Sequence, residues 1–166
     1  DPDTGPRTYT LTTSEEMLDL SQKNLGSADV ALVAAWLQRP EVSAAMNSVT
    51  LDSTGVPKKT TGSRAAIQAS GPRTYTLTVG EEKIDLSQHN LGSADVALVA
   101  TWLQRPEVSA AIAHLALGSN QIGDEAMISL LDVLKDIPLI SFDISKTTCG
   151  VSTATKLAEL LAEETA

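Results

Sequence analysis

The chain has 166 residues, of which 42% are hydrophobic but only 3% are aromatic, and its net charge is -9. This length is enough for one domain with its own core or for two very small domains, and the shortage of aromatic residues predicts a core built from Leu, Val, Ile and Ala. An acidic chain repels phosphate, so the charge argues against binding to nucleic acid or to an anionic membrane. It favours instead another protein with a basic surface.

Cysteine count and hydropathy limit where the protein is expected to act. The single cysteine, Cys149, excludes an internal disulfide framework and fits a reducing compartment. The longest uninterrupted apolar run, 30–37, is far shorter than the roughly 20 residues that a bilayer span needs. The first residues show no signal-peptide pattern. We therefore expect a cytoplasmic protein, with the nucleus as the alternative.

The sequence contains a long internal duplication. Residues 5–45 recur as residues 71–111, with six differences in 41 positions. The duplication is either recent or engineered. It predicts a first copy at 1–56 with a hairpin and about one repeat coil, an irregular junction at 57–73, and a second copy at 74–166 with about three regular coils. One continuous body is the favoured arrangement, because a lone coil cannot bury its own apolar face; a separate first copy on a flexible linker is the alternative.

In chain order, the first predicted element is a β-hairpin. Residues 8–12 alternate between polar and apolar side chains and are followed by a turn-like segment, and the same pattern recurs at 74–78. We predict one hairpin over 8–20 and a second over 74–86. Each would cover the open edge of a sheet, although the second lies in the middle of the chain.

Strand-like pairs of apolar residues, separated by a single residue, recur along the rest of the chain. They are Leu18/Leu20, Val49/Leu51, Ile84/Leu86, Leu115/Leu117 and Phe142/Ile144. A sharp turn follows each pair, and glycine assists most of these turns. Apolar residues four apart, such as Val33 and Leu37, then indicate one face of a helix. A strand, a turn, a helix and a return loop in about 28 residues predict one coil of a parallel solenoid.

The run IAHLALGSNQIG at residues 112–123 resembles the leucine-rich repeat signature LxxLxLxxNxIG. With its helices, the pattern is similar to the ribonuclease-inhibitor-like class, and the resemblance covers 18–52 and 83–162. It implies an α/β fold in the form of a short right-handed solenoid, with parallel strands on a concave face and helices outside. Other residues fill the usual asparagine position in the remaining coils, so its hydrogen-bond ladder is expected to be incomplete there; they are Lys23, Thr54, His89 and Thr147.

The sequence offers no set of residues that predicts catalysis, a metal site or a cofactor. The only two histidines are His89 and His114, whereas metal sites usually need three or four ligands. Cys149 occupies an apolar turn position and is expected to act as a small buried hydrophobe. Trp36 and Trp102 are expected to pack between helix and sheet, with a role as partner anchors as the alternative.

A partner-binding surface is expected on the face that the strands turn away from the helices. The predicted residues of this face are Asp19, Ser21, Thr50, Asp52, Lys83, Asp85, Ser87, His114, Ser141, Asp143 and Ser145. The face is small and mildly acidic, so it suits a basic patch on another protein; the alternative is that it is merely solvated.

The family resemblance implies a non-catalytic protein–protein interaction module. A self-associating structural or engineered repeat scaffold, which would form a homo-oligomer, is one alternative. A GTPase activator is another, since some ribonuclease-inhibitor-like repeat proteins have that activity. It would need an arginine or asparagine on an exposed loop, whereas Arg39 and Arg105 stand at predicted helix ends.

Overall fold

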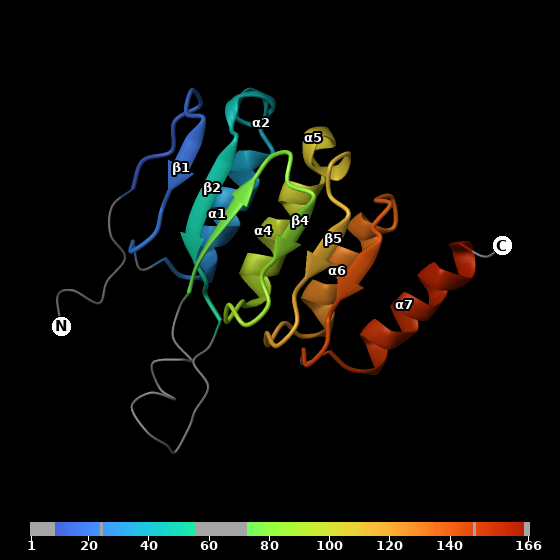
Figure 1. The fold of residues 1–166 in the computed structure, drawn as a ribbon. Helices are drawn as coiled ribbons and strands as arrows, with labels where there is room; N and C mark the ends of the chain where they lie inside the picture. Colours follow the sequence, from blue (N-terminus) through green and yellow to red (C-terminus); the bar gives the residue numbers. More distant parts are fainter. Residues whose placement is uncertain (1–8, 24, 56–72, 148, 165–166) are drawn as a thin grey trace, which may run out of the picture.

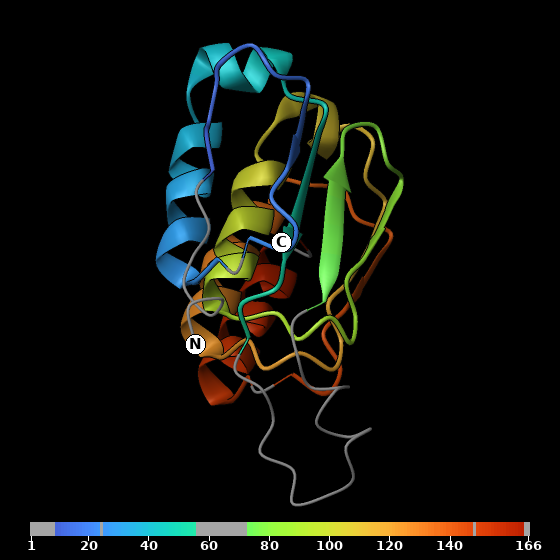
Figure 2. The ribbon, with the colours of Figure 1, turned by 90° about the vertical axis from the view of Figure 1, so that its left-hand side faces the viewer.

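The computed structural model describes residues 9–23, 25–55, 73–147 and 149–164. The strands form one layer and the helices pack behind it as a second layer (Figures 1 and 2). In chain order the elements are β1 (Met17–Asp19), α1 (Ser27–Leu37), α2 (Pro40–Ala45), β2 (Ser48–Asp52), β3 (Thr74–Thr78), β4 (Lys83–Asp85), α4 (Ser93–Leu103), α5 (Pro106–Ser109), β5 (His114–Ala116), α6 (Asp124–Leu134), β6 (Ser141–Asp143) and α7 (Val151–Glu164).

The duplicated helices α1 and α4 begin and end for the same local reasons. In each helix the third residue is an aspartate that turns back to accept the backbone N–H of the glycine before the helix. The Asp29 carboxylate accepts from Gly26 at 2.9 Å, and the Asp95 carboxylate accepts from Gly92 at 2.9 Å. A negative charge here also interacts favourably with the helix dipole. A proline then begins the short helix that follows each of them.

The strands form two separate three-stranded sheets. In the first sheet, β1 pairs with β2 in parallel and β3 pairs with β2 in the antiparallel direction, with Leu77 opposite Val49. In the second sheet, β4, β5 and β6 are all parallel, with Ile84 opposite Leu115 and Leu115 opposite Phe142. The central apolar residues of these strands face the helices, so the core lies between the two layers.

The predicted solenoid, with one run of parallel strands on a concave face, is wrong. Within the residues that the structure describes, β2 is paired with β1 and β3, and β4 belongs to the other sheet. The antiparallel strand β3 occupies the edge of β2 that a continuous parallel sheet would need for β4. Two small sheets are not the arrangement of a leucine-rich repeat. The broader α/β class, with parallel pairing inside each copy, does describe the chain.

The two predicted hairpins are also wrong. Residues 9–16 contain no strand, and residue 8 lies outside the described residues. At 74–86 the chain turns near Gly80, but β3 pairs with β2 and β4 pairs with β5. A longer partner explains the difference: β3 forms five residue pairs with β2, and these bury Tyr75 and Leu77, whereas β4 offers only three residues.

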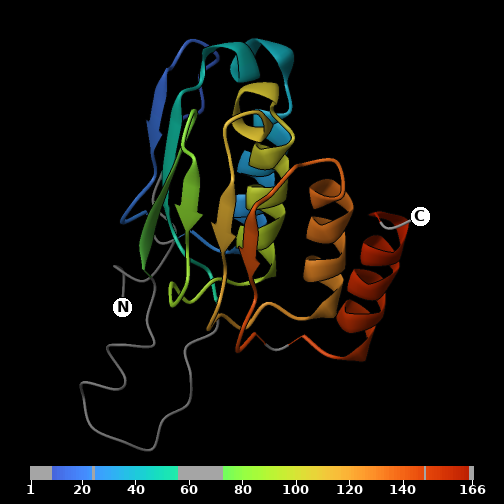
Figure 3. The ribbon, with the colours of Figure 1, turned by 45° about the vertical axis from the view of Figure 1, so that its right-hand side comes forward.

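The helix layer follows the order of the chain. α1 packs on α4, α4 on α6, and α6 on α7, as Figure 3 shows for the last members. The two copies therefore meet through α1 and α4. The expected junction at 57–73 lies outside the described residues except for Arg73, whose backbone bonds to Ser53. In the part of the chain that is described, no helix has the length and apolar character needed to cross a membrane.

Candidate protein-binding surface

The predicted binding residues lie on the face of the strand layer opposite the helices. None of the eleven is buried, and in β1, β4, β5 and β6 they alternate with core residues. The face is divided between the two sheets. The first sheet carries Asp19, Ser21, Thr50 and Asp52, and the second carries Lys83, Asp85, Ser87, His114, Ser141, Asp143 and Ser145.

On the second sheet these residues form rows across the three parallel strands. Asp85, Ala116 and Asp143 are in register, and we call them the carboxylate row. The small side chain of Ala116 separates the two carboxylates. In the neighbouring row, Nδ1 of His114 lies 2.8 Å from the hydroxyl of Ser141. The parallel register therefore brings together two charges that are 58 positions apart in the sequence.

The aspartates that end β1, β4 and β6 are each held by the serine two residues later. The Asp85 carboxylate accepts from the Ser87 hydroxyl at 2.6 Å and from its N–H at 3.1 Å. Asp19 accepts from the Ser21 hydroxyl at 2.6 Å and from its N–H at 2.9 Å, and the Asp143 carboxylate accepts from the backbone of the following serine at 2.8 Å. Such turns hold the charge in place and so reduce the entropic cost of ordering it at binding.

These hydrogen bonds lower the pKa of the three carboxyl groups. The serine hydroxyl is the main cause for Asp19 and Asp85, and the backbone N–H of Ser145 is the main cause for Asp143. The charge of Asp85 acts in the opposite direction on the pKa of Asp143. The two carboxylates of the row therefore interact, and both are ionised at neutral pH.

The lowered pKa values predict a loss of stability in acid. A carboxyl group with a lower pKa in the folded state stabilises the fold above its unfolded pKa, near 3.8, and this contribution disappears as pH falls toward the folded pKa. We expect the free energy of unfolding to fall below about pH 4. The fall should be smaller in a variant with Asp19→Asn, Asp85→Asn and Asp143→Asn. Urea unfolding at a series of pH values tests this; parallel curves for the two proteins would contradict it.

Sequence reasoning missed the threonines of β3, which lie on the same outer face. The hydroxyls of Thr76 and Thr50 are 2.9 Å apart, and the Thr74 hydroxyl donates to Asp52 at 2.6 Å. The other carboxylate oxygen of Asp52 accepts the N–H of Gln22 at 2.7 Å. The Thr-x-Thr-x-Thr alternation at 74–78 is the sequence pattern from which their place on the outer face could have been predicted. Because Asp52 is engaged within the first sheet, the second sheet carries the more available acidic surface.

Comparison with known proteins does not assign the chain to a family. No family model matches the sequence, and no curated protein matches it. The surface must therefore be judged by its own geometry.

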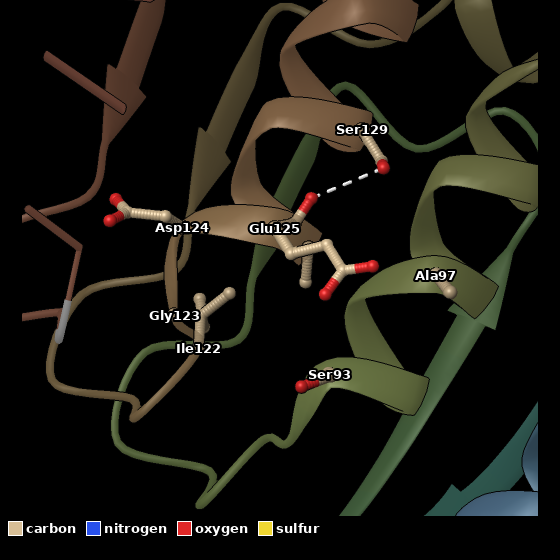
Figure 4. A pocket seen from close by; sticks show the side chains of 8 residues that line it. Ser93, Ala97, Ile122, Gly123, Asp124, Glu125 and Ser129 are labelled. Carbon is tan, nitrogen blue, oxygen red and sulfur yellow. Dashed lines mark hydrogen bonds between the residues drawn. The ribbon is translucent and has the colours of Figure 1, made fainter. Parts of the chain in front are cut away.

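A separate hollow of about 490 Å³ lies between the N-terminal ends of α4 and α6 (Figure 4). The Asp124 side chain points away from it and accepts bonds from Gly150 and Thr153. The Ser129 hydroxyl is bonded to the carbonyl of Glu125 at 3.2 Å. The rest of the lining combines small apolar residues with one further hydroxyl, that of Ser93, and the carboxylate of Glu125. Among the described residues, no three of His, Cys, Asp or Glu come together to hold a metal ion.

Other residues noted in the sequence have structural positions. Trp36 and Trp102 are buried and belong to the hydrophobic core. Arg105 is 6% exposed and stacks on Trp102, whereas Arg39 is 57% exposed and pairs with Glu41. His89 is half-buried. Cys149 is also half-buried, so it is less enclosed than expected.

Proposed function

We propose that the protein is a non-catalytic protein–protein interaction module whose binding surface is the outer face of the second sheet. The observation that supports it is the carboxylate row, in which Asp85 and Asp143 stand in register on either side of Ala116. The partner is a protein with a basic patch. The single half-buried thiol of Cys149 supports a cytoplasmic or nuclear setting for this interaction.

The geometry of the row suits two cationic side chains of a partner. Each carboxylate uses its serine turn to fix one orientation, and both side chains remain exposed to solvent. The residue between the two carboxylates is the small, half-buried Ala116, and the buried Gly118 follows it two positions later in the chain. A Cβ added to Gly118 would lie 3.0 Å from the Ser145 hydroxyl, so the larger side chain is disfavoured there. Two fixed charges of one sign steer a partner and set its register more than they add raw affinity.

Binding of a labelled hexa-arginine peptide, followed by fluorescence anisotropy at low salt, tests the proposal. The peptide represents a basic protein surface. We expect the double variant Asp85→Lys with Asp143→Lys to weaken binding by about tenfold or more, equivalent to about 1.4 kcal/mol. The effect should diminish as salt is added.

The matched control changes the net charge equally on the opposite layer. Glu125→Lys with Glu159→Lys replaces two exposed glutamates on α6 and α7. This variant should retain most of the affinity, because its charges are remote from the row. An equal loss of affinity in both double variants would show that only net charge matters, and would refute a defined binding face.

A further inference from the structure

The duplication places the same side chains in two different environments. On α4 and just after it, Asp95, Leu98, Trp102 and Arg105 follow one another at spacings of three, four and three, and so lie on one side of the helix. We call them the second-copy stripe. The identical residues of the first copy, which we call the first-copy stripe, are Asp29, Leu32, Trp36 and Arg39.

The second-copy stripe is covered by the first copy. At one end, the N–H and the hydroxyl of Thr54 both donate to Asp95, each at 2.7 Å. At the other end, Arg105 Nη2 donates to the carbonyls of Ser43 at 2.5 Å and Met46 at 2.7 Å. Leu98 lies between these two contacts, and α1 packs along the same helix. Its exposure is 0%.

A close contact between two loops extends this interface. The N–H of Gly55 donates to the carbonyl of Asn90 at 2.9 Å, and the Asn90 amide returns a bond to the Gly55 carbonyl at 3.1 Å. A Cβ on Gly92 would lie 3.2 Å from the Cα of Gly55. At Gly26, its equivalent in the first copy, the nearest atom would be the Asp29 carboxylate at 3.8 Å. Among the described residues, this close fit is found at Gly92 and not at its first-copy equivalent, Gly26.

Among the described residues the first-copy stripe is only partly covered: Trp36 is 7% exposed and the Tyr9 hydroxyl donates to Asp29 at 3.1 Å, but its other two members are open. Leu32 is 55% exposed and Arg39 is 57% exposed, against 0% and 6% for Leu98 and Arg105. The segment that forms strand β3 in the second copy also differs between the two copies. Residues 75–78 lie in β3 and pair with β2, whereas the identical residues 9–12 form no strand.

We propose that the first-copy stripe is a docking site for a further repeat unit with the sequence of residues 27–55, joined ahead of residue 9 as the first copy is joined ahead of residue 75. Arg39 would donate hydrogen bonds to the two carbonyls at the end of that unit's short helix. Asp29 would accept hydrogen bonds from the hydroxyl and the N–H of its threonine. Residues 9–12 would pair with its β2. This site lies at the opposite end of the chain's helix layer from α7 and is independent of the acidic face.

Identity of sequence is the physical basis of the proposal. Each group of the first-copy stripe has the same chemistry as a group whose partner is known in the second copy. Repeat units of this kind are stabilised by their nearest neighbours, so a partly open face with the same sequence as the covered side of α4 fits another copy of the unit that covers α4. The unit of this chain that has that sequence, residues 27–55, already packs on α4, so it cannot also cover the first-copy stripe.

The test extends the full chain by one additional copy of residues 5–70, placed directly before Gly5. A cysteine probe, Leu32→Cys in a Cys149→Ser background, reports access to the first-copy stripe through its rate of modification by a thiol reagent. We expect the rate to fall by at least about tenfold in the extended chain, toward the rate of the buried reference Leu98→Cys. An unchanged rate would overturn the proposal.

A second measurement does not depend on the probe. Arg39→Ala should leave the urea midpoint of the parent chain nearly unchanged but lower it in the extended chain, and Arg105→Ala should lower it in the parent. A neutral Arg39→Ala in the extended chain would also overturn the proposal. Protection of Leu32→Cys that arises in the parent at high concentration would mean that another molecule, and not a tandem unit, covers the stripe; that result would likewise refute it.

Discussion

Replacing Asp95 with alanine should destabilise the protein by about 3 kcal/mol or more. The Asp95 side chain is fully buried and its carboxylate accepts four hydrogen bonds. They come from the N–H and hydroxyl of Thr54, the N–H of Gly92 and the hydroxyl of Tyr75, at 2.7 to 2.9 Å. Alanine would leave these donors without their acceptor in the interior. Urea unfolding followed by tryptophan fluorescence measures the effect.

The first copy supplies the control in the same local sequence. Asp29 accepts only from the N–H of Gly26 and, at 3.1 Å, from the hydroxyl of Tyr9, and it remains partly exposed. Asp29→Ala should therefore destabilise the protein by about 1 kcal/mol, the usual effect of losing a helix cap. Equal effects of the two substitutions would show that the contacts of Asp95 with Thr54 and Tyr75 contribute nothing.

Tyr75 is strongly coupled to this carboxylate. Burial, followed by the negative charge of Asp95, raises the pKa of the Tyr75 hydroxyl well above 10. The hydroxyl therefore stays protonated and donates its hydrogen bond throughout the neutral range. Since the pKa is raised in the folded state, this contribution to stability is complete below the unfolded value and is lost as pH rises toward the folded one.

Asn120→Ala is expected to have an effect of similar size, about 3 kcal/mol. The Asn120 side chain is 1% exposed and joins two successive turns. Its Oδ1 accepts from the N–H groups of His89 and Leu91, and its Nδ2 donates to the carbonyls of Leu86 and Leu117. Without the amide, these backbone groups would remain buried and unsatisfied, so the urea midpoint should fall.

Two variants separate the role of the amide from general disturbance. Gln121→Ala changes the exposed neighbour and should alter stability by less than about 0.5 kcal/mol. Asn120→Asp keeps the size of the side chain but turns an acceptor toward two carbonyl oxygens. It should be at least as destabilising as alanine at neutral pH. Wild-type stability of Asn120→Asp would mean that the donated bonds to Leu86 and Leu117 are unimportant.

The positions of the strands and helices could be predicted because they depend on local patterns. Every apolar pair found in the sequence lies on or at the end of a strand, from Leu18 in β1 to Phe142 in β6. The period-two alternation also fixed which side chains point outward, so the carboxylate row could be named residue by residue. The asparagine at position 120 likewise occupies the place that its spacing indicated.

The partner of each strand could not be predicted in the same way. The segment 74–78 carries a good turn after it, and a hairpin is the nearest local solution. The structure instead places it on β2, because the apolar residues Tyr75 and Leu77 match Leu51 and Val49 across a longer ladder. This error also hid the contribution of Thr74 and Thr76 to the outer face.

The duplicated arginines show the limit of local reasoning most directly. Arg39 and Arg105 have identical neighbours in sequence from tryptophan to glutamate, and each pairs with the glutamate two residues later. One is exposed and the other is buried, because only Arg105 lies beside the carbonyls of the first copy. No rule based on a sequence window distinguishes two identical windows.

The antiparallel ladder between β2 and β3 has a consequence for how the chain folds. Residues 74–78, which pair with β2, and residues 8–12 have the same sequence, TYTLT, so both segments offer β2 the same pattern of side chains. During folding they are rival strands for one edge, so a non-native pairing of the first segment with β2 can form before the native one. Escape requires that ladder to open, which is a source of energetic frustration and of kinetic trapping. The duplication that supplies the native strand also supplies its competitor.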